Sequence, residues 1–93
     1  MALRLTWEPR KAASNRRKHG VSFEEAGSAF ADPLSVTVPD PDHSENEERY
    51  LLLGQSDRNR LLVVAHVERG DVIRIINARP ATRRERRRYE EGD

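Results

Sequence analysis

The chain of 93 residues contains no cysteine, so neither a disulfide framework nor a thiolate metal site is possible. No apolar run approaches the roughly 18–20 residues that a membrane span needs. Residues 1–10 also lack the apolar core of a signal peptide. These absences lead us to expect a soluble cytoplasmic protein.

Motifs of the common catalytic centres are missing too. The three histidines, at positions 19, 43 and 66, have neither H-x-x-x-H nor H-x-H spacing, and the acidic residues lack the glycine-anchored order of a calcium loop. There is no G-x-S-x-G elbow, no P-loop and no G-x-G-x-x-G. We therefore expect no metal ion and no other cofactor.

The apolar part of the composition is small. Hydrophobic residues make up 35% of the chain, and charged residues make up another 35%. A chain of this length buries roughly 60–65% of its unfolded surface. We expect a single domain, residues 1–93, with a thin core and marginal stability in the absence of a partner.

The net charge of +1 conceals a strong division along the chain. Residues 1–20 carry +5, residues 21–57 carry −8 and residues 58–93 carry +4. Of the 17 basic residues 15 are arginine, whose planar fork binds phosphate bidentately. A general arginine bias with solvated surface charge is the alternative, and it explains the number of arginines better than their clustering.

Two helices are predicted in the first third of the chain. Pro9 suits the first position of a helix, and Gly20 suits its left-handed end. Ser22, with Glu25 three residues later, has the pattern of a capping box that begins a second helix. Asp32-Pro33 ends it, because the residue before proline is pushed out of the helical region. So tight a corner makes the two helices nearly antiparallel or sharply bent.

The rest of the chain predicts strands and one last helix. A central strand is expected at 61–67, which is apolar on both faces, and Arg69-Gly70 is expected to form a hairpin turn. Thr82 and Glu85 form a second capping box, opening a helix to about Glu90. The other expected strands are residues 3–7, 34–38, 49–56 and 72–78, with a loop at 40–48. The order β-α-α-β-β-β-β-α is that of an α+β fold.

Several motifs occur together in an order that resembles one family of bacterial toxins. They are P-x-K-A-x-x-N-x-x-K-H-G-V-S-F-E-E-A from Pro9, then F-x-D-P, then I-R-I-I-N-A-R-P-A-T from Ile73, and last E-R-R-R-Y. From Trp7 to Glu90 the chain resembles the BrnT family of type II toxins. The resemblance implies a RelE-like fold, a twisted antiparallel sheet with two N-terminal helices and a C-terminal helix.

The resemblance also implies an activity and a partner. The activity is that of a metal-independent endoribonuclease that degrades RNA, inhibits translation and arrests growth. The partner is a cognate BrnA-like ribbon-helix-helix antitoxin in a two-plus-two heterotetramer, which contacts DNA only through the antitoxin. The alternative function is a non-catalytic nucleic-acid-binding or corepressor subunit, whose basic ends only grip phosphate.

Arginine, lysine and histidine suffice in principle to cleave RNA without a metal. The reaction needs the 2′-hydroxyl deprotonated, the charge on phosphorus stabilised and the leaving oxygen protonated. With a two-residue turn at Arg69-Gly70, His66 and Glu68 share a sheet face with Arg79, while Arg74 points to the other face; one bulge would reverse this. We expect Arg79 to stabilise phosphate and His66 to act as acid or base, with Glu68 and Arg74 completing the candidate catalytic set.

Further basic residues are candidates for RNA binding: Lys18, His19, Arg58, Arg83, Arg84 and Arg87. Each candidate has a structural alternative. His66 can be a packed strand histidine, Glu68 can hold the turn, and Arg74 can pair with Glu24 or Glu25. Lys18 and His19 can simply end a helix, where cations are favoured. The arginines of the last helix can form a solvated face.

Overall fold

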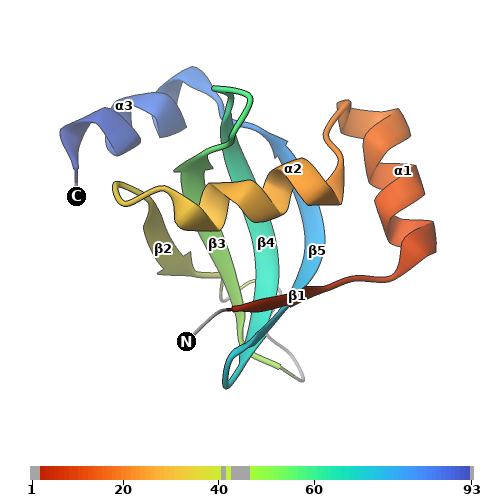
Figure 1. Ribbon diagram of the computed structural model, residues 1–93. Coiled ribbons are helices and arrows are strands. Elements are labelled where there is room, and N and C mark those ends of the chain that lie inside the picture. The colour runs from red at the N-terminus through yellow and green to blue at the C-terminus, as the bar shows by residue number, and fades with distance from the viewer. Residues whose placement is uncertain (1–2, 41, 43–46, 93) are drawn as a thin grey trace.

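The computed structural model describes residues 3–40, 42 and 47–92. Its elements follow the predicted order (Figure 1). They are β1 (Arg4–Thr6), α1 (Pro9–His19), α2 (Phe23–Ser28) with the 3₁₀ turn η1 (Ala29–Ala31), β2 (Val36–Pro39), β3 (Arg49–Gln55), β4 (Leu61–Arg69), β5 (Val72–Pro80) and α3 (Arg83–Glu91). The α+β class and the order of elements are confirmed; part of the expected loop at 40–48 lies outside the described residues.

The strands form one sheet in the order β1-β5-β4-β3-β2. β4 is the middle strand, and residues 61–67 are all buried, as the apolar run predicted. The sheet is mixed, because β1 runs parallel to β5 while the other pairs are antiparallel. β1 joins the sheet through helices and not through a hairpin, so nothing in its connection requires an antiparallel partner.

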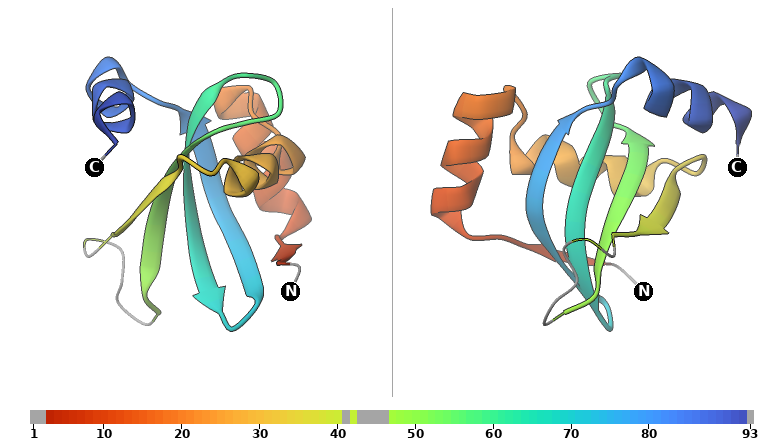
Figure 2. Two further views of the ribbon diagram at one scale, coloured as in Figure 1. Left: turned by 60° about the vertical axis from the view of Figure 1, so that its left-hand side comes forward. Right: turned by 180° about the vertical axis from the view of Figure 1, so that it is seen from behind.

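The two faces of the sheet are covered differently (Figure 2). α2 and η1 pack on one face, which we call the covered face, and α1 stands beside β5. The covered face holds the larger apolar cluster, formed by Val21, Phe23, Ala26, Ala29, Leu52, Leu62, Val64, Ile75 and Ala78. On the other face, the open face, α3 covers one end, where Ala81 and Tyr89 pack against Leu53, Leu61 and Val63.

The corner between α1 and α2 is sharply bent and is built as the sequence predicted, with one exception. Gly20 has φ 71°, and its N–H donates to the Arg16 carbonyl. The Ser22 hydroxyl accepts from the Glu25 N–H. The second hydrogen bond expected of this capping box, from the Ser22 N–H to the Glu25 carboxylate, is wrong. The carboxylate turns instead toward the turn between β3 and β4. The box at Thr82 and Glu85 is complete.

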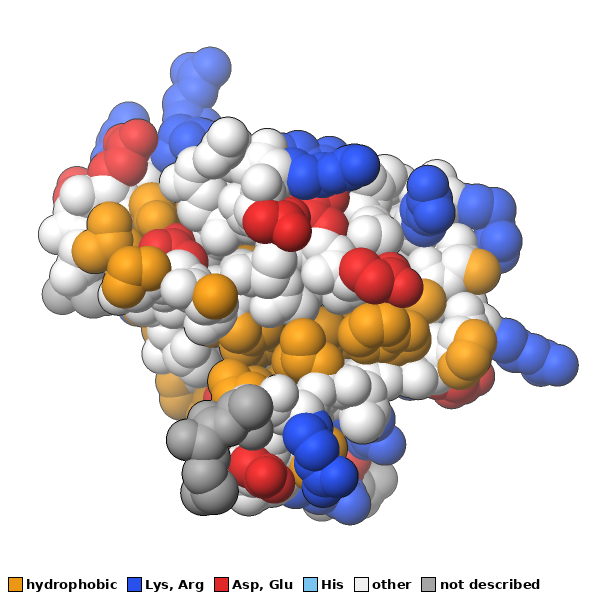
Figure 3. Space-filling view, viewed as in Figure 1, with side chains coloured by type: hydrophobic (Ala, Val, Ile, Leu, Met, Phe, Trp, Pro, Cys, Tyr) orange, Lys and Arg blue, Asp and Glu red, His pale blue; other side chains and the backbone are white. Residues whose placement is uncertain are grey.

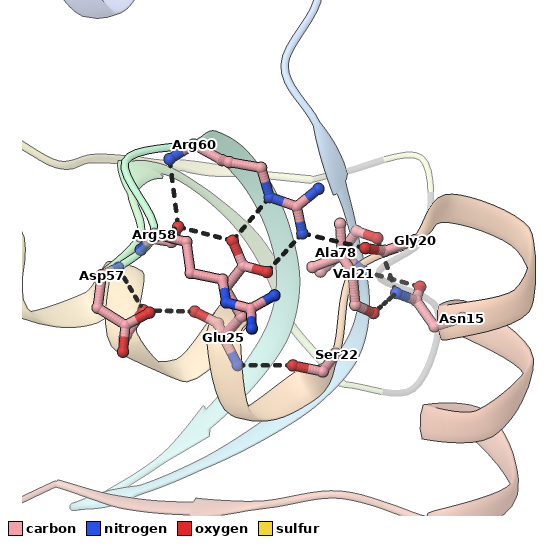
Figure 4. A network of polar contacts seen from close by, with 11 residues as sticks. Asn15, Gly20, Val21, Ser22, Glu25, Asp57, Arg58, Arg60 and Ala78 are labelled. Carbon is pink, nitrogen blue, oxygen red and sulfur yellow. Dashed lines mark hydrogen bonds and ion pairs between the residues drawn. The ribbon is translucent and has the colours of Figure 1, made fainter.

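Glu25 is only 5% exposed and joins the corner to the β3–β4 turn (Figure 4). Its carboxylate accepts from Arg60 Nε at 2.9 Å and from Ser56 Oγ at 2.7 Å. Arg60 Nη2 also donates to the Gly20 carbonyl at 3.0 Å. The hydrogen bond from Arg60 holds the pKa of Glu25 below its ordinary value, so this buried carboxylate stays charged and paired.

Asn15 attaches α1 to the edge of β5. β1 pairs with β5 only from Val72 to Arg74, which leaves the backbone of Ala78 facing outward. The Asn15 side chain accepts from the Ala78 N–H at 3.0 Å and donates to the Ala78 carbonyl at 2.8 Å. It also donates to the Val21 carbonyl at 3.0 Å. One amide therefore satisfies three backbone groups at once. Its two bonds to Ala78 replace those that a neighbouring strand would make there.

A β-bulge in the β4–β5 hairpin changes which residues share a face. The turn is Gly70-Asp71 and not Arg69-Gly70, because Arg69 pairs with Val72. From the turn to the pair of His66 and Ile75 the register is regular. The next pair is Ala65 with Asn77, so Ile76 has no partner on β4 and is the extra residue of the bulge. The predicted sharing of a face by His66 and Arg79 is therefore wrong. Arg79 lies on the open face with Arg74, and His66 lies on the covered face.

We predict that Asn15→Ala lowers the free energy of unfolding by about 2–3 kcal/mol, because it leaves buried backbone groups without partners. The nearly isosteric Asn15→Asp should also destabilise, since a carboxylate cannot donate to the two carbonyls. Denaturant unfolding measures both. Arg17→Ala, an exposed change on the same helix, is the control. Unchanged stability in Asn15→Ala would contradict this role.

Candidate functional site

A basic hollow lies between α1 and the C-terminal half of β5. Its volume is about 350 Å³. It is lined by Lys11, Ser14, Asn15, Lys18, His19, Ile76, Asn77 and Arg79. We call it the cationic pocket. It combines three cationic side chains with an imidazole, and none of its lining residues carries a carboxylate.

The helix period explains why α1 contributes these residues. Lys11, Ser14 or Asn15, and Lys18 are spaced three to four residues apart, which places them on one side of a helix. Asn15 fixes that side against β5 through its bonds to Ala78. Lys18 and His19 lie in the last turn of α1, where the helix dipole favours positive charge.

Figure 3 shows how charge is distributed over one side of the molecule. Lys and Arg side chains gather over α1 at one end and over α3 at the other, and Asp and Glu side chains lie over α2 between them. Further Lys and Arg side chains lie at the bottom of this view, and some Asp and Glu side chains lie beside α3. The cationic pocket belongs to the basic end at α1.

Arg79 is held in place by Glu85. The two terminal nitrogens of Arg79 donate to the two Glu85 oxygens, each at 2.8 Å. Mainly because of this pairing, and with help from the Thr82 N–H, the pKa of Glu85 falls to about 2. Nη1 of Arg79 also donates to the Pro80 carbonyl at 3.3 Å. Of the five N–H groups of a guanidinium, Nε–H and one on Nη2 remain for another acceptor.

His66 is packed in the strand, as in the structural alternative to a catalytic role. Its ring is 0% exposed and meets Phe30 edge-on, with ring centroids 4.8 Å apart. Nδ1 lies 3.1 Å from the Val64 carbonyl, and Nε2 lies 2.9 Å from Glu68 Oε2. The ring is on the covered face, about 10 Å along the strand from the level of Arg79, at roughly 3.3 Å per residue. The structure does not bring His66 and Glu68 to Arg79.

Arg74 also stands apart from Arg79, although the bulge puts both on the open face. Its Nη2 donates to Glu47 Oε1 at 2.6 Å. The alternative considered for Arg74, a pairing with Glu24 or Glu25, does not occur, because those residues lie on the covered face and Arg74 points away from it. The four predicted catalytic residues thus do not form one centre.

The predicted RNA-binding residues fall into three places. Lys18 and His19 line the cationic pocket. Arg58 lies beside the α1–α2 corner, in a hollow of about 440 Å³ that it shares with Glu24, Glu25 and Asp57. The remaining three, Arg83, Arg84 and Arg87, are exposed on α3. Sequence reasoning missed Lys11 and Ser14, whose spacing from Lys18 was the available signal, and left Asn77 out of the site.

The last helix is docked, although its sequence is polar on nearly every side. The Tyr89 hydroxyl donates to Asp32 Oδ2 at 2.6 Å, and this bond raises the pKa of Tyr89 to about 12. At its start, Glu85 joins α3 to Arg79. Two polar contacts and a small apolar cluster therefore hold α3, and its arginines point outward.

The part of the chain that the structure describes contains no group of three or more His, Asp or Glu side chains placed to hold a metal ion. None of its helices is long and apolar enough to cross a membrane.

A small α+β domain with an acid-free basic pocket belongs to a class of protein suited to binding a polyanion. Residues 7–85 match the family described as the ribonuclease toxin BrnT of type II toxin–antitoxin systems. This chain therefore belongs to the BrnT family of ribonuclease toxins. Membership implies an antitoxin as partner and RNA as target.

A solved structure has the same fold. It is the 1.1 Å crystal structure of the Brucella abortus ribonuclease toxin BrnT, with a TM-score of 0.68 and 18% sequence identity. The match covers 88% of this chain and 100% of that chain. At this identity the likeness establishes the fold and not the site. No curated protein matches the chain.

We predict that Glu85→Gln lowers the stability of the fold at neutral pH by about 1 kcal/mol, because it removes the charge that pairs with Arg79 while the amide oxygen can still accept from the Thr82 N–H. Because the folded pKa of Glu85 is about 2, below its ordinary value of 4.5, its contribution is present above that ordinary value and is lost as pH falls through about 2. As pH falls from 4.5 to about 2, the variant should therefore lose less stability than the wild type. Unfolding measured against pH, with Glu90→Gln as the exposed control on α3, tests this; the same pH profile in wild type and Glu85→Gln would contradict it.

Proposed function

We propose that the cationic pocket holds the scissile phosphodiester of RNA and that Arg79 stabilises the negative charge that develops on phosphorus. The observation that carries the proposal is the convergence of Lys11, Lys18, His19 and Arg79 on one hollow without a lining carboxylate. A pocket of this charge attracts a polyanion and leaves no acidic group to repel it.

The proposed reaction is an internal transfer at phosphorus. The 2′-oxygen of the RNA forms a bond to phosphorus and loses its proton, while the bond from phosphorus to the 5′-oxygen breaks and that oxygen gains a proton. A 2′,3′-cyclic phosphate and a 5′-hydroxyl result. No metal is required if positioned cations carry the extra charge, and one preorganised donor is typically worth about 10²–10³ in rate.

Arg79 suits the charge-stabilising role because Glu85 orients it while leaving N–H donors for a phosphate. Lys11 and Lys18 supply further positive charge from α1. Of the two histidines that the structure describes, His19 lines the pocket and His66 has no exposed surface. We therefore assign the proton transfers to His19 rather than to His66. His66 and Glu68 support the covered face, and Arg74 acts away from the reacting phosphate.

The partner is proposed to be a BrnA-like antitoxin with a ribbon-helix-helix part, in a two-plus-two complex that contacts DNA through the antitoxin alone. Family membership supports an antitoxin; the finer identity rests on the motif resemblance. Cleavage of RNA that halts translation also supports a cytoplasmic site of action. The exposed arginines of α3 are a second basic surface available to RNA or to the partner.

We predict that Arg79→Ala abolishes growth arrest and slows RNA cleavage by about 10²–10³, the value of one lost charge-stabilising donor. Arg79→Lys should recover only part of the activity, since a point charge cannot replace the planar fork. Cleavage is measured on purified protein, beside its melting temperature.

The control is Arg10→Ala, which removes one positive charge from the exposed start of α1 outside the pocket. Full activity in a folded Arg79→Ala protein would remove Arg79 from the mechanism. RNA that stays intact in the presence of wild-type protein, while binding persists, would favour the non-catalytic corepressor instead.

We also predict that RNA binding weakens steeply with salt. If the four basic residues of the pocket neutralise about four phosphates, the logarithm of the association constant should fall with that of salt concentration with a slope of roughly −3 for a single strand. Titration of an uncleavable 2′-O-methyl oligonucleotide at several salt concentrations gives the slope. A response independent of salt would exclude the cationic pocket as the RNA surface.

A further inference from the structure

A second basic hollow lies on the open face, at the opposite end of β5 from the cationic pocket. Its volume is about 220 Å³, and it is lined by Thr6, Val67, Arg69, Val72 and Arg74. We call it the open-face hollow. It is separate from the candidate site described above and shares no residue with it.

Three neighbouring strands build the open-face hollow. Thr6 of β1 lies beside Arg74 of β5, which lies opposite Val67 of β4. One step along, Val72 of β5 lies opposite Arg69 of β4. Two valines therefore form an apolar floor, and two guanidiniums and one hydroxyl stand around it. The guanidiniums can bind a phosphate, and the valines offer apolar surface that an attached nucleoside can cover.

A carboxylate of the chain already occupies the space between the two arginines. Glu47 forms an ion pair with Arg69 through one oxygen and with Arg74, at 2.6 Å, through the other. The arginine side chains are 71% and 50% exposed, so both are reachable from solvent. Two guanidiniums that grip one carboxylate have the geometry needed to grip a phosphate.

The bulge at Ile76 aligns this hollow with the cationic pocket. Because of it, Arg74, Asn77 and Arg79 all belong to the open face of β5. Arg74 pairs with Val67 and Arg79 with Val63, so the two arginines lie four steps apart along the sheet, about 13 Å at roughly 3.3 Å per residue. A single strand of RNA spans such a distance with a few nucleotides, so one strand can reach both places.

We propose that the open-face hollow is a second nucleotide subsite for the RNA strand whose scissile phosphate lies in the cationic pocket. A phosphate of that strand replaces the Glu47 carboxylate between Arg69 and Arg74, and the attached nucleoside covers Val67 and Val72. The inference rests on the proposed function and deepens it: the protein prefers RNA long enough to fill both hollows, and Glu47 competes with the substrate.

Removal of the competing carboxylate tests this inference. Glu47→Gln should tighten binding of a long 2′-O-methyl oligonucleotide about three- to fivefold, the range of an exposed ion pair. Glu48→Gln is the matched control, because it removes the same charge from the neighbouring position, where the carboxylate accepts from the Tyr50 hydroxyl. Equal effects of the two variants would mean that only net charge matters and would overturn the subsite.

A second pair of variants separates the two hollows. Arg69→Ala combined with Arg74→Ala should weaken binding of the long oligonucleotide about tenfold and leave cleavage of a dinucleotide unchanged. Arg79→Ala should lower cleavage of both substrates. If Arg79→Ala cleaves the dinucleotide normally, the proposed function fails, whatever the double variant does. If the folded double variant binds long RNA normally, the proposed nucleotide subsite is overturned. If the double variant loses only its binding to the antitoxin, the open-face hollow binds an acidic peptide instead.

Discussion

The candidate site depends on one side-chain amide. β5 has a strand partner on its outer edge only from Val72 to Arg74, and Asn15 supplies the partner for Ala78 further along. By bonding to the Val21 carbonyl as well, it fixes the end of α1 relative to the chain that follows. Lys11 and Lys18 face β5 because Asn15 sets the rotation of α1. A buried residue without any charge thus determines where the charges of the pocket meet.

A second constraint is the pairing of arginine with glutamate. Glu25 pairs with Arg60, Glu47 with Arg69 and Arg74, and Glu85 with Arg79. The pairings of these three glutamates have different consequences. The first is largely buried and joins helices to the sheet. The second covers an open-face hollow, and the third orients an arginine toward the cationic pocket. Glu25 and Glu47 come from the acidic middle of the chain, which therefore helps to position arginines of the basic C-terminal segment.

Much of the fold was predictable from local signals. Pro9, Gly20 and Thr82 have strong positional preferences at helix ends, and the apolar run of residues 61–67 identified the central strand. The site was harder, because a bulge at Ile76 leaves no clear mark in a sequence of alternating residues, yet it moves Arg79 to the other face. The burial of His66 beneath Phe30 is likewise a tertiary contact that no spacing reveals. Lys18 and His19, which were predicted to bind RNA, both line the cationic pocket, and their RNA-binding role stays a prediction.

We propose above that RNA lies in the cationic pocket between α1 and β5. The most direct measurement is the change in backbone amide chemical shifts when a 2′-O-methyl oligonucleotide is added to the labelled protein. We expect the largest changes at Lys11, Lys18, His19, Asn77 and Arg79. Large changes confined to α3, with these five amides unmoved, would contradict it.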